Sequence, residues 1–264
     1  MKLINNYHTH TARCGHALGE DEEYVLNAIK AGVEELGFSD HIPFPDVSQP
    51  GVRMEYDRLN EYIDSINTLK EKYKDQIKIY VGFEAEYFSE VKNYYIDLLK
   101  KVDYLICGQH FSLNSDHKMI YSGYKRDDKS VLEDYTVRVV DAIESGLFKY
   151  IAHPDIILNS YTLRDEYLDS CIRRICEAAE RCHIPLEVNL EGIKKQVSLD
   201  IIGKESFYPY DYFWNIAKEY KIDVILGGDI HDPVDFLADY DKYGYNIISK
   251  FGLHHIQKLI INEK

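Results

Sequence analysis

Two histidines, His8 and His10, lie two residues apart just after a short apolar segment near the start of the chain. Residues at positions i and i+2 of a β-strand project to the same face, so both imidazoles are expected to point the same way. A divalent metal ion takes such neutral imidazole nitrogens as ligands. A His-x-His pair is also common at a polar strand edge, so the pair gains meaning only from the rest of the chain.

Six further short apolar segments follow, and most of them end in a histidine or an acidic residue. Together with the first loop, these segment ends carry His16, His41, Glu84, His110, His153, Asp229 and His231. Taken singly, any one of these histidines is best explained as a core residue that is hydrogen-bonded to the backbone. Taken together, neutral imidazoles and two carboxylates in one cavity need a cation to make their packing tolerable. The set therefore predicts a metal centre.

The elements that must position these residues alternate between short strands and amphipathic helices. After a first strand that ends near residues 7–10, strands are predicted at 35–38, 77–83, 104–108, 150–152, 186–189 and 223–227. Helices are predicted at 20–31, 59–74, 91–100, 131–145, 163–182 and 210–220, followed by a terminal helical pair. We interpret 112–129 as a polar and aromatic insert and 190–209 as a long loop.

Seven strand–helix units in alternation predict an α/β protein with a parallel sheet, and their number favours closure into a distorted (β/α)7 TIM-like barrel over an open sheet. In such barrels the C-terminal ends of the strands form one mouth, where the polar residues above would meet. No linker or low-complexity tract divides the chain, so residues 1–264 are expected to form a single domain.

Composition narrows the class of protein. No apolar run reaches membrane-spanning length and no signal peptide precedes the first strand, so a cytoplasmic protein without a membrane partner is expected. The five cysteines form no C-x-x-C motif, which fits reduced thiols. A net charge of −14 argues against a nucleic-acid partner, whereas a small anion is compatible with a metal-lined pocket. The oligomeric state stays open.

These motifs, in this order, resemble the polymerase and histidinol phosphatase (PHP) family over nearly the whole chain. The motifs that carry the resemblance are His8-x-His10, His16, Asp40-His41, Gly82-Phe83-Glu84, Gly108-Gln109-His110, His153-Pro154-Asp155 and Gly228-Asp229-Ile230-His231. The chain is most similar to the histidinol-phosphatase branch, which shares the opening His-Thr-His-Thr, a cysteine before the next histidine, Asp-His-Ile-Pro, and the Tyr208-Pro209 pair.

The resemblance implies the PHP fold and three divalent metal ions, which would be zinc, manganese or iron. It implies one ion held by His8, His10, Glu84 and Asp229, a second held by Glu84, His110 and His153, and a third held by His16, His41 and His231. Glu84 and Asp229 are therefore candidate catalytic carboxylates. Asp40 is a further candidate that would orient His41, with a loop cap as the alternative. Cys14 is interpreted as a small buried residue.

The family's chemistry is hydrolysis of phosphomonoesters, because clustered divalent metals activate water and neutralise phosphate charge. The expected enzyme is a metal-dependent phosphatase, histidinol-phosphatase of histidine biosynthesis, acting on a small phosphorylated substrate. One alternative is a PHP phosphoesterase for another small ester, such as a nucleoside bisphosphate or a phosphotyrosyl peptide. The other is a metal-binding module without turnover.

The substrate side of the site is less clearly marked, because relatives often place an arginine in the loop after strand five or six and this chain does not. Lys194 or Arg13 is expected to contact phosphate, with Arg164 behind them; a solvated side chain is the alternative for each. Asp155 or Glu191 is expected to attract the amine of histidinol phosphate. A helix cap or a surface charge is the alternative for either.

Overall fold

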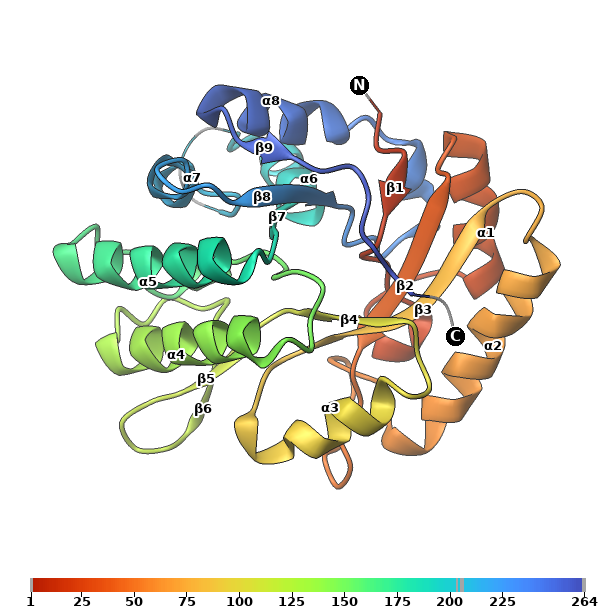
Figure 1. Ribbon diagram of the computed structural model, residues 1–264, viewed down its shortest axis with the longest axis horizontal. Helices are drawn as coiled ribbons and strands as arrows, with labels where there is room; N and C mark the ends of the chain where they lie inside the picture. The colour runs from red at the N-terminus through yellow and green to blue at the C-terminus, as the bar shows by residue number, and fades with distance from the viewer. Residues whose placement is uncertain (1, 203, 205–206, 263–264) are drawn as a thin grey trace.

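One parallel sheet curls around an axis and is covered by helices on its outside (Figure 1). The computed structural model describes residues 2–202, 204 and 207–262. The first run of neighbouring strands in the sheet comprises, in spatial order, β1 (Asn5–Asn6), β2 (Glu35–His41), β3 (Lys78–Ala85) and β4 (Tyr104–Cys107). The second run comprises β7 (Leu186–Asn189), β8 (Asp223–Gly227) and β9 (His254–His255). All of these pairings are parallel.

Single-residue bridges join the two runs and close the ring. Ile151 bridges to Cys107 on one side and to Leu186 on the other, so the predicted strand at 150–152 is reduced to one paired residue. On the opposite side, Thr9 bridges to Ile230, which connects the chain beyond β1 to the chain beyond β8. The predicted distorted barrel is confirmed. The short final strand β9 lies where the sequence predicted only helices.

Eight α-helices are assigned within the described residues, and they flank the sheet. They are α1 (Asp21–Ala31), α2 (Leu59–Lys72), α3 (Lys92–Leu98), α4 (Lys129–Ser145), α5 (Glu166–Cys182), α6 (Leu190–Ser198), α7 (Asp211–Ala217) and α8 (Asp241–Phe251). Short 3-10 turns include η1 (Ala12–Cys14), η2 (Tyr56–Arg58), η3 (Ser89–Val91), η4 (Ile156–Asn159) and η5 (Pro233–Leu237). None of the described helices is long and apolar enough to cross a membrane.

Two segments differ from their prediction. The first half of the expected loop 190–209 forms α6, because the side chain of Asn189 accepts a hydrogen bond from the Gly192 N–H at 3.0 Å and so caps the helix N-terminus. The insert 112–129 contains most of an antiparallel hairpin made of β5 (Phe111–Leu113) and β6 (Met119–Tyr121).

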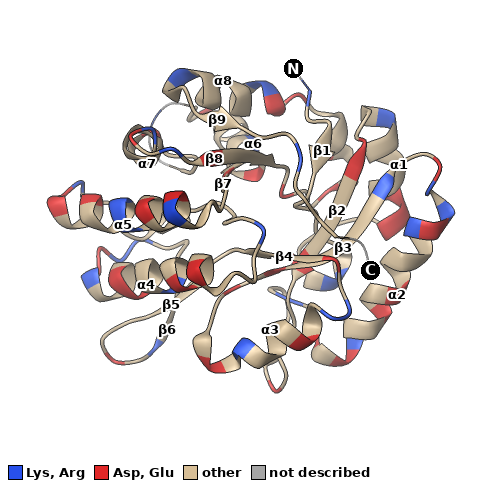
Figure 2. Ribbon diagram, viewed as in Figure 1, with Lys and Arg blue, Asp and Glu red and all other residues tan. Residues whose placement is uncertain are grey.

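Tyrosine side chains fill much of the barrel interior. Tyr7, Tyr80, Tyr104 and Tyr150 pack together there with Leu259 from the C-terminal segment. A larger apolar cluster occupies the space between sheet and helices. Charged residues lie mainly on the outer helices and loops, with both signs interspersed (Figure 2). The polar groups of a site are therefore confined to the strand ends.

Candidate metal centre

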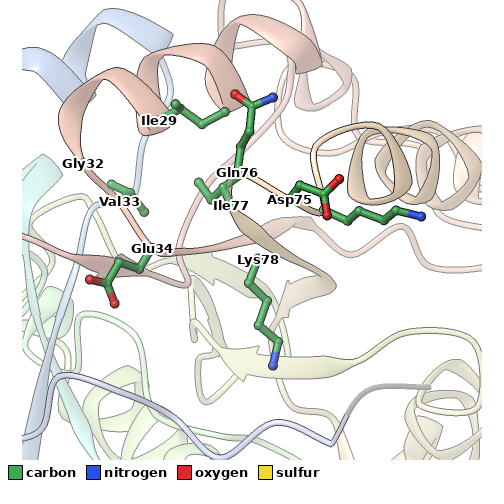
Figure 3. Close-up of a pocket in the computed structure, with 9 residues that line it drawn as sticks. Ile29, Gly32, Val33, Glu34, Asp75, Gln76, Ile77 and Lys78 are labelled. Carbon is green, nitrogen blue, oxygen red and sulfur yellow. The ribbon is translucent and has the colours of Figure 1, made fainter.

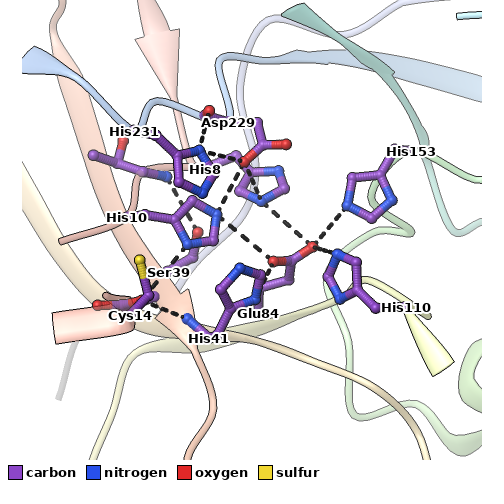
Figure 4. Close-up of polar contacts among 12 residues, drawn as sticks. His8, His10, Cys14, Ser39, His41, Glu84, His110, His153, Asp229 and His231 are labelled. Carbon is purple, nitrogen blue, oxygen red and sulfur yellow. Dashed lines mark hydrogen bonds and ion pairs between the residues drawn. The ribbon is translucent and has the colours of Figure 1, made fainter. Parts of the chain in front are cut away.

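Glu84, near the end of β3, lies at the centre of a cluster of imidazoles (Figure 4). The nearest ring nitrogens to its two carboxylate oxygens belong to His153, His41, His8, His110 and His10, at 2.8, 3.0, 3.5, 3.5 and 3.6 Å respectively. The side chain of Glu84 is only 1% exposed. Burial by itself would raise the pKa of Glu84, but His110, His8 and His41 hold it well below its usual range. The carboxylate is therefore an anion ringed by imidazoles.

Asp229, which follows β8, is the second carboxylate of the cluster. Its Oδ1 atom lies 3.0 Å from His10 Nε2, 3.4 Å from His8 Nε2 and 3.4 Å from His231 Nδ1. His231 in turn places its Nε2 atom 3.1 Å from His16 Nε2, at the exposed side of the cluster. The structure thus brings together all nine side chains that the sequence singled out as metal ligands.

The donor atoms of this cluster fit divalent cations. Buried atoms without a hydrogen-bond partner include His8 Nε2, both ring nitrogens of His10, Glu84 Oε2 and His153 Nδ1. Such orphaned groups are rare and costly in a protein interior unless something binds them. Sets such as His8–His10–Asp229 and His8–Glu84–His153 hold their ligand atoms within 4.8 Å of one another. The cluster is a site for divalent metal ions, since they accept mixed imidazole and carboxylate ligands.

The protonation pattern agrees with this conclusion. Burial lowers the pKa of His10, but Asp229 and Asp40 outweigh burial and raise it to about 9. Burial and the neighbouring His10 lower the pKa of His41 to about 4. A bound metal ion would take the place of these protons, because it binds the neutral imidazole nitrogen.

Asp40 orients its neighbours differently from the prediction. Its Oδ1 atom accepts a hydrogen bond from the backbone N–H of His41 at 2.7 Å. This bond is made to the backbone of His41 and not to its imidazole ring. The imidazole beside it belongs to His10, whose Nδ1 lies 3.6 Å away, and the Thr11 hydroxyl donates to its other oxygen. Cys14 is buried as expected, and burial together with Asp40 raises the pKa of its thiol to about 12.

Glu187, on β7, is a functional candidate that the sequence interpretation missed. Its carboxylate accepts hydrogen bonds from His8 Nδ1 at 2.8 Å, from the His153 backbone N–H at 2.9 Å and from Asn189 Nδ2 at 2.9 Å. Asn189 Nδ2 also lies 3.0 Å from Asp229 Oδ2. Carboxylates behind ligating histidines fix the ring orientation and tautomer. The available signal was an acidic residue and an amide two apart in an otherwise apolar strand.

A buried ion pair between Arg53 and Glu86 is the second feature missed. The guanidinium contacts Glu86 Oε2 at 3.1 Å and Oε1 at 2.9 Å, and Oε1 is 3.3 Å from His110 Nδ1. Arg53 comes from the proline-containing loop after β2. Glu86 follows Glu84 at the same i, i+2 spacing as the first histidine pair, which was the signal that it shares a face with the cluster.

Glycines make room for two buried carboxylates of the site, Glu84 and Glu187. A Cβ atom on Gly108 would lie 1.9 Å from Glu84 Oε1, and one on Gly227 would lie 1.6 Å from Glu187 Oε1. Both distances are far below any van der Waals contact. The Gly-Gln-His and Gly-Gly-Asp motifs therefore leave space for a carboxylate on the neighbouring strand.

A cavity of about 680 Å³ opens beside the cluster. Of the three residues predicted to contact phosphate, one lines this cavity and two do not. Lys194 lines it together with Lys195. Arg13 does not, because its guanidinium is held by Asp21 at 2.7 Å and by a second carboxylate. Arg164 does not either, since it stacks on the Tyr210 ring and on a neighbouring tyrosine. The structure thus brings only Lys194 of this group to the site.

Another hollow, of about 450 Å³, lies between the end of α1 and the turn that precedes β3 (Figure 3). Its lining includes Ile29, Val33, Asp75 and Lys78 and contains no histidine. It is located at the N-terminal end of the strands, away from the cluster. Catalytic groups of α/β barrels lie at the opposite end, so this hollow is not the active-site candidate.

A curled parallel barrel with a histidine- and carboxylate-rich centre at its strand ends defines a class of metal-dependent hydrolases. Residues 6–191 match the PHP domain, and the chain belongs to that family. It is 29% identical to a probable histidinol-phosphatase of Deinococcus radiodurans over 238 residues, which is 88% of each chain. It is 25% identical to the histidinol-phosphatase of Bacillus subtilis over 266 residues, which covers 89% of this chain and 96% of the relative.

A solved structure extends the likeness to the fold. The histidinol phosphate phosphatase of Lactococcus lactis, crystallised with zinc, L-histidinol and phosphate, superimposes with a TM-score of 0.70. The match covers 98% of this chain and all of the other, at 20% sequence identity.

Proposed function

We propose that the protein is a histidinol-phosphatase, which hydrolyses L-histidinol phosphate to L-histidinol and phosphate. The observation that carries the proposal is the convergence of the predicted ligands around Glu84 and Asp229, in a chain whose relatives of similar length have that name. We also propose that all 264 residues act as one phosphoesterase domain in the cytoplasm, supported by the bridge between residues 9 and 230 and by five free thiols.

The proposal includes three metal ions and assigns residues to each. The first would be held by His8, His10, Glu84 and Asp229, the second by Glu84, His110 and His153, and the third by His16, His41 and His231. Zinc is favoured because the Lactococcus structure contains it, with manganese and iron as alternatives. When bound, such ions activate water and neutralise charge on phosphate.

The chain's own residues orient these groups. One oxygen of Glu84 faces His8, which is assigned to the first ion, together with His110 and His153, which are assigned to the second, so this carboxylate would be shared between the two metal positions. Glu187 holds the His8 ring through Nδ1 and thereby leaves Nε2 directed at Glu84 and Asp229. Asn189 fixes one oxygen of Asp229, which leaves Oδ1 toward the cluster.

Phosphate recognition would fall to Lys194. Its Nζ donates to Asp235 Oδ2 at 2.6 Å, which fixes the ammonium at the cavity wall. Asp235 and Glu191 offset part of this charge, but the ammonium has three N–H donors and lies at the cavity wall, so it can still donate to a phosphate oxygen. Lys195 lines the same cavity and adds a second positive charge.

The test is phosphate release by protein loaded with zinc or manganese. L-histidinol phosphate would be compared with a generic aryl phosphate and a nucleoside 3′,5′-bisphosphate. The proposal predicts a clear preference for L-histidinol phosphate, lost in His8→Ala and Glu84→Gln and lost reversibly on treatment with a chelator. Better turnover of another ester would move the enzyme to a different substrate. Metal binding without release from any of the three would indicate a binding module.

A further inference from the structure

Aromatic side chains line the cavity next to the metal centre. Tyr121 and Tyr124, from the end of the β5–β6 hairpin, pack edge to face at 5.2 Å, and Phe111 lies 5.6 Å from Tyr121. The side chain of Tyr124 is 66% exposed and that of Tyr121 is 38% exposed. Large aromatic surfaces left open beside a polar pocket mark binding sites.

The aromatic lining continues inward to the metal ligands. The Tyr208 ring lies 5.9 Å from the ring of His153 and is almost fully buried. Tyr121, Tyr208 and Asp229 all line the same cavity. A ring that entered the cavity would therefore lie over tyrosines while its substituent approached the cluster.

Glu191 supplies a negative charge in the same cavity. It lies in the first turn of α6, and its side chain is 13% exposed. Lys194 and Lys195 form ion pairs with it at 3.4 and 3.5 Å, while the shorter hydrogen bond of Lys194 is made to Asp235. The carboxylate oxygens line the cavity and can accept a further hydrogen bond from a ligand ammonium.

The other acidic candidate from the sequence, Asp155, is located differently. It is 1% exposed and is absent from the cavity lining. Its Oδ2 atom accepts a hydrogen bond from the Tyr210 N–H at 2.6 Å, so it joins the turn after Ile151 to the start of α7. Of the two acidic residues, only Glu191 faces the substrate space.

We propose that Tyr121, Tyr124 and Glu191 form the subsite for the alcohol portion of the phosphate ester, and that they select an alcohol carrying both a flat ring and an ammonium group. The inference rests on the proposed function, because the ester bond must lie at the metal centre. The ring stacks on the tyrosines, and the ammonium forms a charged hydrogen bond with Glu191. Lys194 and Lys195, which lie beside Glu191 in the same cavity, would contact the phosphate.

Three esters that carry these features together or singly test the assignment. L-histidinol phosphate has a ring and an amine, 2-phenylethyl phosphate has a ring alone, and O-phosphoethanolamine has an amine alone. Glu191→Gln should lower kcat/KM for the two amines about ten- to hundredfold relative to that for 2-phenylethyl phosphate, as expected for loss of a charged hydrogen bond. Tyr121→Leu should lower it about two- to tenfold for the two ring esters and leave O-phosphoethanolamine unchanged.

Product inhibition gives a second readout that does not depend on the chemical step. Glu191→Gln should weaken inhibition by L-histidinol relative to inhibition by inorganic phosphate, while Glu191→Asp should restore part of the L-histidinol binding. Asp239→Asn and Tyr56→Leu are matched controls, because both side chains are exposed and neither lines the cavity. Neither control should change the ranking of the three esters.

The outcomes separate this inference from the proposed function. If the wild-type protein does not prefer L-histidinol phosphate to simple esters, the proposed function fails whatever the variants do. If that preference is present but Glu191→Gln slows 2-phenylethyl phosphate as much as the amines, Glu191 serves the reaction in general and the subsite is refuted. The subsite is equally refuted if both variants keep the wild-type ranking.

Discussion

The buried pair of Arg53 and Glu86 allows a sharp test of how the site is supported. Arg53 forms two contacts with the Glu86 carboxylate, at 2.9 and 3.1 Å, and donates to the Ile42 carbonyl at 2.8 Å. Both side chains are 2% exposed. Burial raises the pKa of Glu86, but Arg53 and His110 reverse the effect and hold it well below its usual range. Arg53→Met keeps much of the side-chain volume and removes the charge.

The expected cost follows from the burial. Breaking a buried ion pair from one side leaves an uncompensated charge and costs about 3–5 kcal/mol, whereas an exposed pair contributes about 0–1 kcal/mol. Arg53→Met should therefore lower the free energy of unfolding by about 3–5 kcal/mol, or the melting temperature by roughly 10 °C in a chain of this size. Arg58→Met is the matched control, because Arg58 pairs with Glu61 on the surface.

The assay is denaturant unfolding of chelator-treated protein, so that altered metal binding does not enter the result. Arg53→Met, Glu86→Gln and the double variant complete a thermodynamic cycle. The double variant should cost clearly less than the sum of the single variants, because it leaves no unpaired buried charge. A loss below about 1 kcal/mol for Arg53→Met, or additivity within about 0.5 kcal/mol, would refute the reasoning.

Two further predictions concern the neighbouring residues. Gly227→Ala should reduce both metal content and melting temperature, because the new Cβ would meet Glu187 Oε1 at 1.6 Å and this carboxylate is fully buried; unchanged metal content by elemental analysis would contradict that. Arg13→Ala should keep kcat/KM for L-histidinol phosphate within about twofold, because its guanidinium is committed to Asp21 and Glu61; a large rise in KM would place Arg13 at the phosphate instead.

The metal centre was predictable because its signal is local. His8 and His10 share a face by strand geometry, and the further candidate ligands, except His16 in the first loop, follow apolar segments that the barrel directs to one mouth. The helices 20–31 and 131–145 were predictable for the same reason, since periodicity and a terminal glycine define them, and the structure has them at Asp21–Ala31 and Lys129–Ser145.

The supporting residues were not predictable in the same way. Glu187 has no motif of its own, and its importance appears only when Asp229 and His153 are brought beside it by distant parts of the chain. The partners of a charged side chain are likewise set by tertiary packing. Arg13 has a suitable charge beside the histidine motif, but in the folded chain its guanidinium forms an ion pair with Asp21.

Strained backbone at two ligands links the fold to the site. His153 has φ +30° and Asp229 has φ +49°, both in the left-handed region that costs about 1–3 kcal/mol for such residues. In each case the chain leaves a strand and must turn its side chain inward. Glu187 accepts a hydrogen bond from the His153 N–H, and Asn189 donates one to the Asp229 carboxylate, so one pair on β7 contacts both candidate ligands. The neighbouring Glu187–Asn189 contact makes the two turns a single unit, and the tyrosine-filled barrel beneath gives that unit a rigid base.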